Sequence, residues 1–172
     1  GLWWSRFDDL ALTPGDGANR GDDAGDRINL DMQIRITRVR PNAVIPAYAS
    51  AGAAAFDLTA AETIIIPPKE QGVIPTGLVF QIPADHVFHI FSRSSTFSKL
   101  GLLLANGVGV IDSDYCGPKD EVCMLFYNPS DTEVTIQAGT RVAQGMIYPH
   151  PRIEFVEGKA EGTNRGGFGS TG

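Results

Sequence analysis

Two carboxylates and a phenol lie close together in residues 104–117, whose sequence is LANGVGVIDSDYCG. The alternation of apolar residues up to Ile111 predicts a strand that ends in a turn carrying Asp112, Asp114 and Tyr115. A carboxylate at the end of a buried strand is either hydrogen-bonded structurally or held as a base, because desolvating it without a partner is costly. On these residues alone, an Asp that caps the turn is the commoner interpretation, and an Asp that acts as a general base is the alternative.

A hydroxyl-rich segment that follows a predicted strand has the composition of a phosphate site. Residues 91–101 read FSRSSTFSKLG and offer Arg93, Ser94 and Ser95. A turn of small hydroxyl residues beside a guanidinium supplies the convergent N–H and O–H donors that a polyphosphate accepts. An ordinary Ser-rich surface loop with a solvated Arg is the alternative, and this segment alone does not decide between them.

The last eight residues, RGGFGSTG, repeat the same combination of groups. Arg165, Ser170 and Thr171 could bind phosphate, and the glycines would allow the backbone to approach a ligand closely. Phe168 is an aromatic residue that could stack on a nucleic base. A mobile Gly-rich tail without a ligand is the alternative, and it is the better interpretation of this segment in isolation.

The composition is that of one globular domain rich in strands. The chain has 172 residues, 42% of them hydrophobic, and its 20 Gly and 11 Pro indicate many turns and few long helices. A formal net charge of -6 argues against broad nucleic-acid binding, because proteins that bind phosphate backbones carry a basic face. No apolar run is long enough to cross a bilayer, so no membrane association is expected. We expect Cys116 and Cys123 to be free thiols in a reducing, cytoplasmic compartment.

Short strands must position these candidate residues. Residues 1–31 are rich in Asp and Gly and predict a disordered leader. Alternation begins at Met32, and residues 32–152 predict an all-β domain of sandwich, jelly-roll or barrel type. Residues 153–172 predict a second flexible arm. The expected strands within the domain are residues 32–39, 72–82, 86–91, 122–127, 133–136 and 141–148.

Five segments in a fixed order are far more specific than any one of them. They are AAAFDL with Asp57, SRSS with Arg93, GVIDSDYCG with Asp112 and Tyr115, RVAQGMI with Arg141 and Gln144, and the terminal RGGFGSTG. This set resembles the trimeric deoxyuridine triphosphatase (dUTPase) family over residues 32–172. One departure is the stretch between Gly117 and Asn128, which is longer than the usual family pattern and implies an altered turn at residues 118–121.

The resemblance implies a distorted jelly-roll or β-clip barrel that assembles as a homotrimer with shared active sites. It implies the hydrolysis of dUTP to dUMP and pyrophosphate with Mg²⁺, which keeps uracil out of DNA and supplies dUMP for thymidylate synthesis. The implied location is the cytoplasm, or the host cytoplasm if the chain is encoded by a virus or phage. The role of residues 1–31 lies outside the resemblance.

The resemblance also implies a role for each matching residue. Asp112 matches the carboxylate that activates the attacking water, and Tyr115 matches the ring that packs under the deoxyribose and excludes a 2′-hydroxyl. Asp57 matches the acidic residue near the water shell of the metal. The remaining residues fall into three groups: the hairpin that reads uracil (Asn106, Gly109, Val110 and Ile111), the phosphate ligands (Arg93, Ser94, Ser95 and Gln144), and the closing arm (Arg165, Phe168, Gly169 and Ser170).

Two other functions are compatible with parts of this pattern. A dCTP deaminase of the same fold would share the Ile111 to Asp112 region, but we expect such an enzyme to lack both Tyr115 and the terminal GFGSTG. A trimer without enzymatic activity could use the same scaffold as an interaction module, in which residues 1–31 carry the function. The intact set of motifs favours the hydrolase over both.

Overall fold

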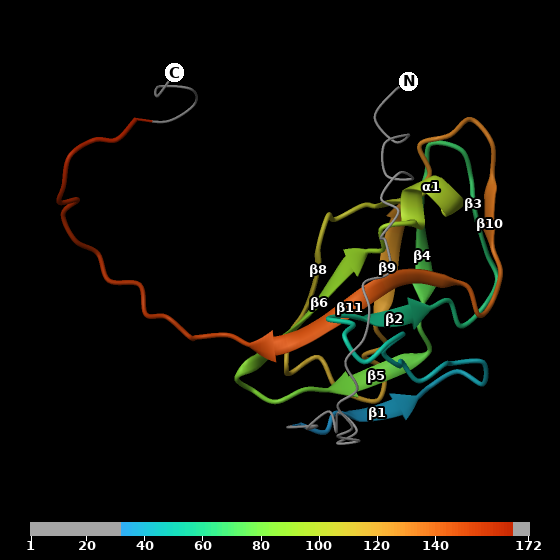
Figure 1. The fold of residues 1–172 in the computed structure, drawn as a ribbon, viewed down its shortest axis with the longest axis horizontal. Helices are drawn as coiled ribbons and strands as arrows, with labels where there is room; N and C mark the ends of the chain where they lie inside the picture. The colour runs from blue at the N-terminus through green and yellow to red at the C-terminus, as the bar shows by residue number, and fades with distance from the viewer. Residues whose placement is uncertain (1–31, 167–172) are drawn as a thin grey trace, which may run out of the picture. The chain divides into compact units, whose positions relative to one another are not determined.

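The computed structural model describes residues 32–166 as eleven short strands and one helix of five residues (Figure 1). The prediction of an all-β domain is confirmed. In chain order the strands are β1 (Arg35–Arg38), β2 (Phe56–Thr59), β3 (Ile64–Ile66), β4 (Gln71–Pro75), β5 (Leu78–Gln81), β6 (His86–Ser92), β7 (Leu103–Leu104), β8 (Gly109–Ile111), β9 (Cys123–Tyr127), β10 (Val134–Ile136) and β11 (Arg141–Pro149), and helix α1 (Thr96–Leu100) lies between β6 and β7.

The largest sheet has the strand order β2-β11-β6-β8, and a three-stranded sheet has the order β4-β9-β7. Two further antiparallel pairs, β1 with β5 and β10 with β3, complete the strands. In β6 the side chains alternate, so that Phe88 and Ile90 are buried while Val87, His89 and Phe91 are partly exposed. This period of two is what a sheet with one face on a core requires.

Three phenylalanines, one each from β2, β5 and β6, pack together in the core. The ring of Phe88 on β6 lies 4.8 Å from that of Phe80 and 5.6 Å from that of Phe56, measured between ring centroids. Gly145 on β11 leaves the room for them, because a Cβ at that position would lie 2.6 Å from ring atoms of both Phe56 and Phe88. The glycine of the RVAQGMI segment is therefore a packing requirement of the sheet.

Two local features differ from the sequence prediction. Residues 72–82 do not form one strand, because the chain turns between β4 and β5, where Gly77 has a φ of 70°. That left-handed conformation favours glycine and ends the extended strand. The hydroxyl-rich segment also contains the unpredicted α1, which ends at Gly101 in a left-handed cap with a φ of 68°.

Within the described range, residues 32–34 before β1 and residues 150–166 after β11 contain no strand or helix. Residues 150–166 follow β11 without regular structure and are exposed from Pro151 onward. The predicted leader, residues 1–31, and the last six residues lie outside the described range. Cys116 and Cys123 are both free thiols, as predicted. No helix among residues 32–166 is long and apolar enough to cross a membrane.

We expect Gly145→Ala to destabilise the domain, because the added methyl group would overlap two buried rings. Overpacking of this kind costs about 1–3 kcal/mol. Urea unfolding followed by circular dichroism would measure the loss. Gly52→Ala is the matched control, since a Cβ at Gly52 meets no atom within 4 Å. Equal unfolding midpoints for the two variants would contradict this account of the core.

Candidate functional site

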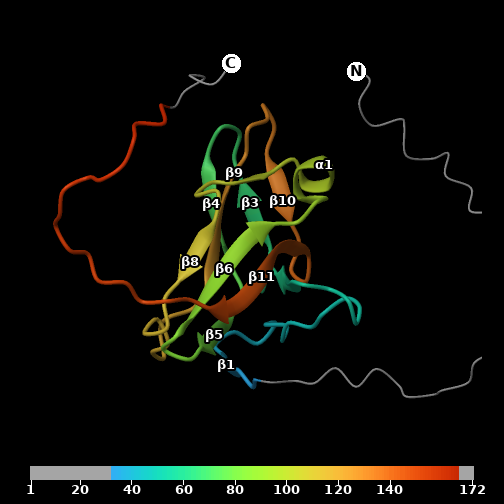
Figure 2. The ribbon, with the colours of Figure 1, turned by 60° about the vertical axis from the view of Figure 1, so that its left-hand side comes forward.

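The Arg93 loop, defined as residues 92–96, is fixed to the main sheet by one buried hydroxyl. Thr96 is 2% exposed; its Oγ1 donates to the carbonyl oxygen of Val142 at 3.0 Å and accepts the backbone N–H of Arg93 at 2.9 Å. Thr96 thus joins the end of β6 to β11. Both figures that show the ribbon place α1 just beyond the end of β6 (Figures 1 and 2).

Asp57 on β2 holds two arginines side by side. Its Oδ1 accepts Nε of Arg93 at 2.6 Å, and its Oδ2 accepts Nη1 of Arg141 at 3.0 Å. Asp57 and Arg93 are mostly buried, with side chains 17% and 24% exposed. Two guanidinium groups and one carboxylate leave a net positive charge here, and the N–H groups that Asp57 does not use can donate to an oxyanion.

A β-bulge explains why Arg141 reaches the same site as Gln144. In a regular strand two residues three positions apart point to opposite faces. The register of β11 against β2 shifts between Arg141 and Ala143, and such a bulge brings both side chains to the side of Asp57. Gln144 lies directly opposite Asp57, and its Nε2 donates to the carbonyl oxygen of Ser92 at 2.9 Å.

The structure therefore brings together most of the predicted phosphate ligands. Nη1 of Arg93 lies 3.4 Å from the hydroxyl of Ser95, and Ser94 follows directly in the same loop. Arg141 belongs to the RVAQGMI motif, but the sequence predicts no function for it. Its pairing with Asp57, 84 residues away in the chain, depends on tertiary contact and has no local sequence signal.

The residues predicted to read uracil lie in the turn after β7 and on β8. These two strands do not pair as the predicted hairpin, because β7 pairs with β9 and β8 pairs with β6 in a different sheet. Gly107 has a φ of 70°, and the N–H of Val108 donates to the carbonyl oxygen of Asn106 at 2.7 Å. Gly109 lies against the core, since a Cβ there would be 2.9 Å from Cβ of Ile90. Val110 is 58% exposed, so much of its surface is open for contact with another molecule.

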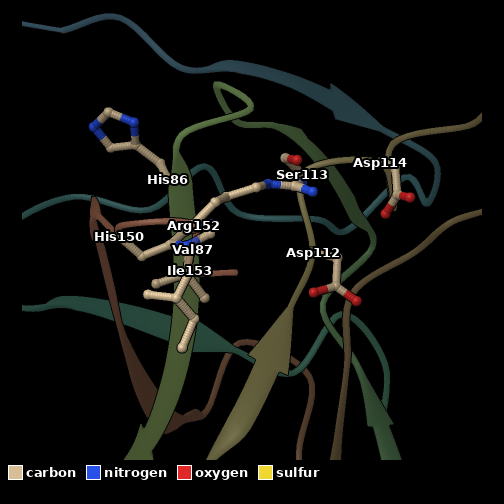
Figure 3. A pocket seen from close by; sticks show the side chains of 8 residues that line it. All are labelled: His86, Val87, Asp112, Ser113, Asp114, His150, Arg152 and Ile153. Carbon is tan, nitrogen blue, oxygen red and sulfur yellow. The ribbon is translucent and has the colours of Figure 1, made fainter. Parts of the chain in front are cut away.

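Asp112 follows the end of β8 and lines a groove of about 440 Å³ (Figure 3). Asp112 and Asp114 contribute carboxylates to this groove, and Arg152 extends toward Ser113. Asp112 is exposed in the single chain rather than set in an apolar environment. The groove also contains two histidines that the sequence analysis missed, and its lining residues are His86, Val87, Asp112, Ser113, Asp114, His150, Arg152 and Ile153.

Within one chain, Asp112 and the Arg93 loop lie toward opposite ends of β6. Ile111 pairs with Phe88 near the start of β6, whereas Arg93 follows its last residue. The five steps from Phe88 to Arg93 extend over about 17 Å at about 3.3 Å per residue. A general base must lie within hydrogen-bonding reach of its proton, directly or through one water. These two groups of one chain therefore cannot act on the same reacting phosphate in this arrangement.

Tyr115 lies three residues beyond Asp112 and is 40% exposed. Its hydroxyl donates to the carbonyl oxygen of Glu121 at 3.1 Å. Burial raises the pKa of this phenol above its ordinary value, and the nearby Asp120, Cys123 and Glu121 raise it further. The Tyr115 hydroxyl therefore stays protonated and able to donate at neutral pH.

The predicted closing arm is described only at its start. Arg165 is exposed and lies in the stretch without regular structure. Phe168, Gly169 and Ser170 lie outside the described residues. Their assignment to the site remains a prediction.

The domain is a jelly-roll-type β-fold in which the Arg93 loop and Arg141 of β11 together offer paired guanidinium groups and hydroxyls, as in a site for a polyphosphate. The family model described as dUTPase matches residues 41–172, well over half of the chain. The chain belongs to the dUTPase family.

Individual relatives agree with this assignment. The deoxyuridine 5'-triphosphate nucleotidohydrolase of Wolinella succinogenes is 41% identical over 144 residues, covering 82% of this chain and 95% of that protein. The crystal structure of the Streptococcus mutans dUTPase has a TM-score of 0.67 at 32% identity and covers 72% of this chain and 100% of its own. A mutant dUTPase from phage phi11 of S. aureus, described with a structural Mg(II) ion, has a TM-score of 0.64 at 25% identity, with coverages of 74% and 98%.

Thr96→Val should loosen the Arg93 loop. The substitution keeps the shape of the side chain but leaves the N–H of Arg93 and the carbonyl of Val142 without their partner. Unsatisfied buried groups cost about 1–3 kcal/mol, so the midpoint of urea unfolding should fall and KM for dUTP should rise. The control is Ser98→Ala, which removes an exposed hydroxyl bonded to Ser95 within the same turn. If both variants behave alike, Thr96 does not anchor the loop.

Proposed function

We propose that the chain hydrolyses dUTP to dUMP and pyrophosphate, with Asp112 as the general base. The observation that carries this proposal is the contrast between two carboxylates. Asp57 is occupied by Arg93 and Arg141, so it is unsuited to accept a proton. Asp112 lines an open groove at the end of β8, and no hydrogen bond to its carboxylate occurs among residues 32–166.

The reaction assigned to Asp112 is the activation of one water molecule. A carboxylate oxygen of Asp112 takes a proton as the water oxygen forms a bond to the α-phosphorus of dUTP. The bond from the α-phosphorus to the bridging oxygen breaks, and that oxygen leaves with the β- and γ-phosphates as pyrophosphate. Arg93, Ser94, Ser95 and Gln144 orient the triphosphate, and the arginine places positive charge where negative charge moves.

A divalent cation fits this donor set if it arrives with the substrate. No group of three His, Cys, Asp or Glu residues within 32–166 is arranged to hold a metal. Mg²⁺ commonly binds through substrate phosphates, retained waters and one or two carboxylates. We assign Mg²⁺ to the triphosphate, with Asp57 facing its water shell, and when bound it neutralises charge on the phosphate oxygens. The phage phi11 enzyme described with a structural Mg(II) ion supports a cation in this family.

We further propose a homotrimer in which each active site combines groups from different chains. The separation of Asp112 from the Arg93 loop along β6 supports a site completed by a second chain. The chain also has two different exposed apolar patches on its sheets. One contains Val108 and Val110 beside β6, and the other contains Val73 and Leu103 on the β4-β9-β7 sheet. A contact between two unlike patches would be heterologous and would form a ring if its rotation closes, and the homotrimer is the ring that the family resemblance implies.

Residues 153–172 complete the proposed site as an arm that closes over bound nucleotide. The described part, residues 153–166, is exposed and contains no strand or helix. Such a segment can become ordered on a ligand and exclude water from it. We assign base stacking to Phe168 and phosphate contacts to Arg165 and Ser170, with the backbone of Gly169 close to the nucleotide. The free thiols fit the cytoplasmic location that we propose.

The two alternative functions are not favoured. The dUTPase family model and the named relatives argue against a dCTP deaminase of the same fold, and an interaction module would not need the paired arginines at Asp57. One assay separates the three functions: pyrophosphate release from dUTP, measured beside ammonia release from dCTP. Ammonia without pyrophosphate, or neither product, would contradict the proposal.

Asp112→Asn should leave the fold and dUTP binding nearly intact while it lowers kcat. The loss of a general base commonly costs roughly 10²- to 10⁴-fold in rate. Steady-state release of pyrophosphate measures the effect, and calorimetric titration with a non-hydrolysable dUTP analogue checks binding. Asp114→Asn makes the same change of charge in the same groove and should have a far smaller effect. An Asp112→Asn enzyme with wild-type kcat would remove Asp112 from the mechanism.

A further inference from the structure

The longer segment after Tyr115 folds into a closed turn. The N–H of Gly117 donates to Oδ2 of Asp120 at 2.7 Å, and the N–H of Asp120 donates to the carbonyl oxygen of Gly117 at 3.0 Å. A carboxylate that caps its own turn in this way fixes the local backbone. The turn at residues 117–120 brings Glu121 back to Tyr115, whose hydroxyl donates to the carbonyl oxygen of Glu121.

Glu121 is itself one of the most firmly held side chains near the site. Its carboxylate accepts Nε and Nη2 of Arg40 at 2.7 and 2.9 Å, and it also accepts the backbone N–H of Gly77 at 2.7 Å. The side chain of Glu121 is only 15% exposed. The hydrogen bond from Arg40 to Glu121 raises the pKa of the Arg40 guanidinium, so Arg40 stays charged. A bidentate pair of this kind fixes direction as well as distance.

The residue after Glu121 is anchored to the core. Val122 is fully buried, its N–H donates to the carbonyl oxygen of Leu78 at 2.9 Å, and its carbonyl oxygen accepts the hydroxyl of Thr76 at 2.6 Å. The backbone carbonyl of Glu121 is thus held by a side-chain ion pair and by the following strand connection. Tyr115, by contrast, is partly exposed and has one hydrogen bond to a backbone group.

We infer that Glu121, held by Arg40, is a positioning residue that fixes the Tyr115 ring and thereby sets the selectivity for deoxyribose over ribose. The inference rests on the proposed function, in which the Tyr115 ring packs against the sugar. A ring excludes a 2′-hydroxyl only if it cannot move away, because a displaced ring would leave space for the extra oxygen. The backbone carbonyl of Glu121 restrains the ring by accepting the hydrogen bond from the Tyr115 hydroxyl.

The test compares kcat/KM for dUTP with kcat/KM for UTP in three variants. Glu121→Gln weakens the bidentate pair, and Tyr115→Phe keeps the ring but removes its bond to Glu121. Each should lower the dUTP/UTP ratio by roughly ten- to a hundredfold, the scale of loss expected when a group is displaced by about 1 Å. Glu62→Gln is the matched control, because Glu62 pairs with the same Arg40 at 3.1 Å but has no bond to Tyr115 or Gly77 among the described residues.

A double variant separates positioning from a general loss of stability. If both substitutions act on the same restraint, Glu121→Gln combined with Tyr115→Phe should lower the ratio little more than either alone. Additive effects, or a ratio that stays at the wild-type value in folded Glu121→Gln protein, would overturn the inference. If Glu121→Gln does not fold, an unchanged ratio in Tyr115→Phe overturns it equally. A wild-type protein that does not hydrolyse dUTP would overturn the proposed function, and the inference with it.

Discussion

The length of β6 is the main structural constraint on the site, because it sets how far Asp112 lies from the Arg93 loop. Its seven residues hold the Arg93 loop at one end and the partner strand of Asp112 at the other. Hydrogen bonds to β11 and β8 keep β6 extended, so the two groups of one chain stay far apart. A water-activating carboxylate and a triphosphate ligand must nevertheless meet on one nucleotide. The proposed trimer would meet that requirement by combining groups from different chains.

Three carboxylates near the site differ in their partners. Asp57 is paired with Arg93 and Arg141, and Glu121 is paired with Arg40 beside the turn that reaches Tyr115. Asp112 lines an open groove, and its carboxylate has no hydrogen-bond partner among residues 32–166. A carboxylate that stays paired with a cation is a poor proton acceptor, whereas an open one becomes a better base when another surface excludes water from it. Assembly would therefore change the chemistry of Asp112 more than that of Asp57.

Sequence patterns predicted the class of fold and most of the strands, because alternation and turn residues are local signals. Motifs in a specific order also suggested which residues form the site. The structure brings Asp57, Arg93 and Gln144 together, and the roles of the site residues stay predictions. The sequence patterns did not predict the break at Gly77, the helix α1 or the role of Arg141. The ion pair of Arg141 joins residues 84 positions apart, and that of Arg40 with Glu121 joins residues 81 apart. Such contacts depend on tertiary packing, and on a bulge in β11 that no local pattern reveals.

Subunit mixing tests the shared site most directly. Arg93→Ala chains retain Asp112, and Asp112→Asn chains retain Arg93, so each variant alone should be inactive. In an equal, fully exchanged mixture, about a quarter of the sites in a heterologous ring should combine the intact Asp112 of one chain with the intact Arg93 of its neighbour. Pyrophosphate release from dUTP should return to about that fraction of the wild-type rate, with exchange followed by native mass spectrometry. A fully exchanged mixture without activity would show that both groups must come from one chain, and would contradict the account.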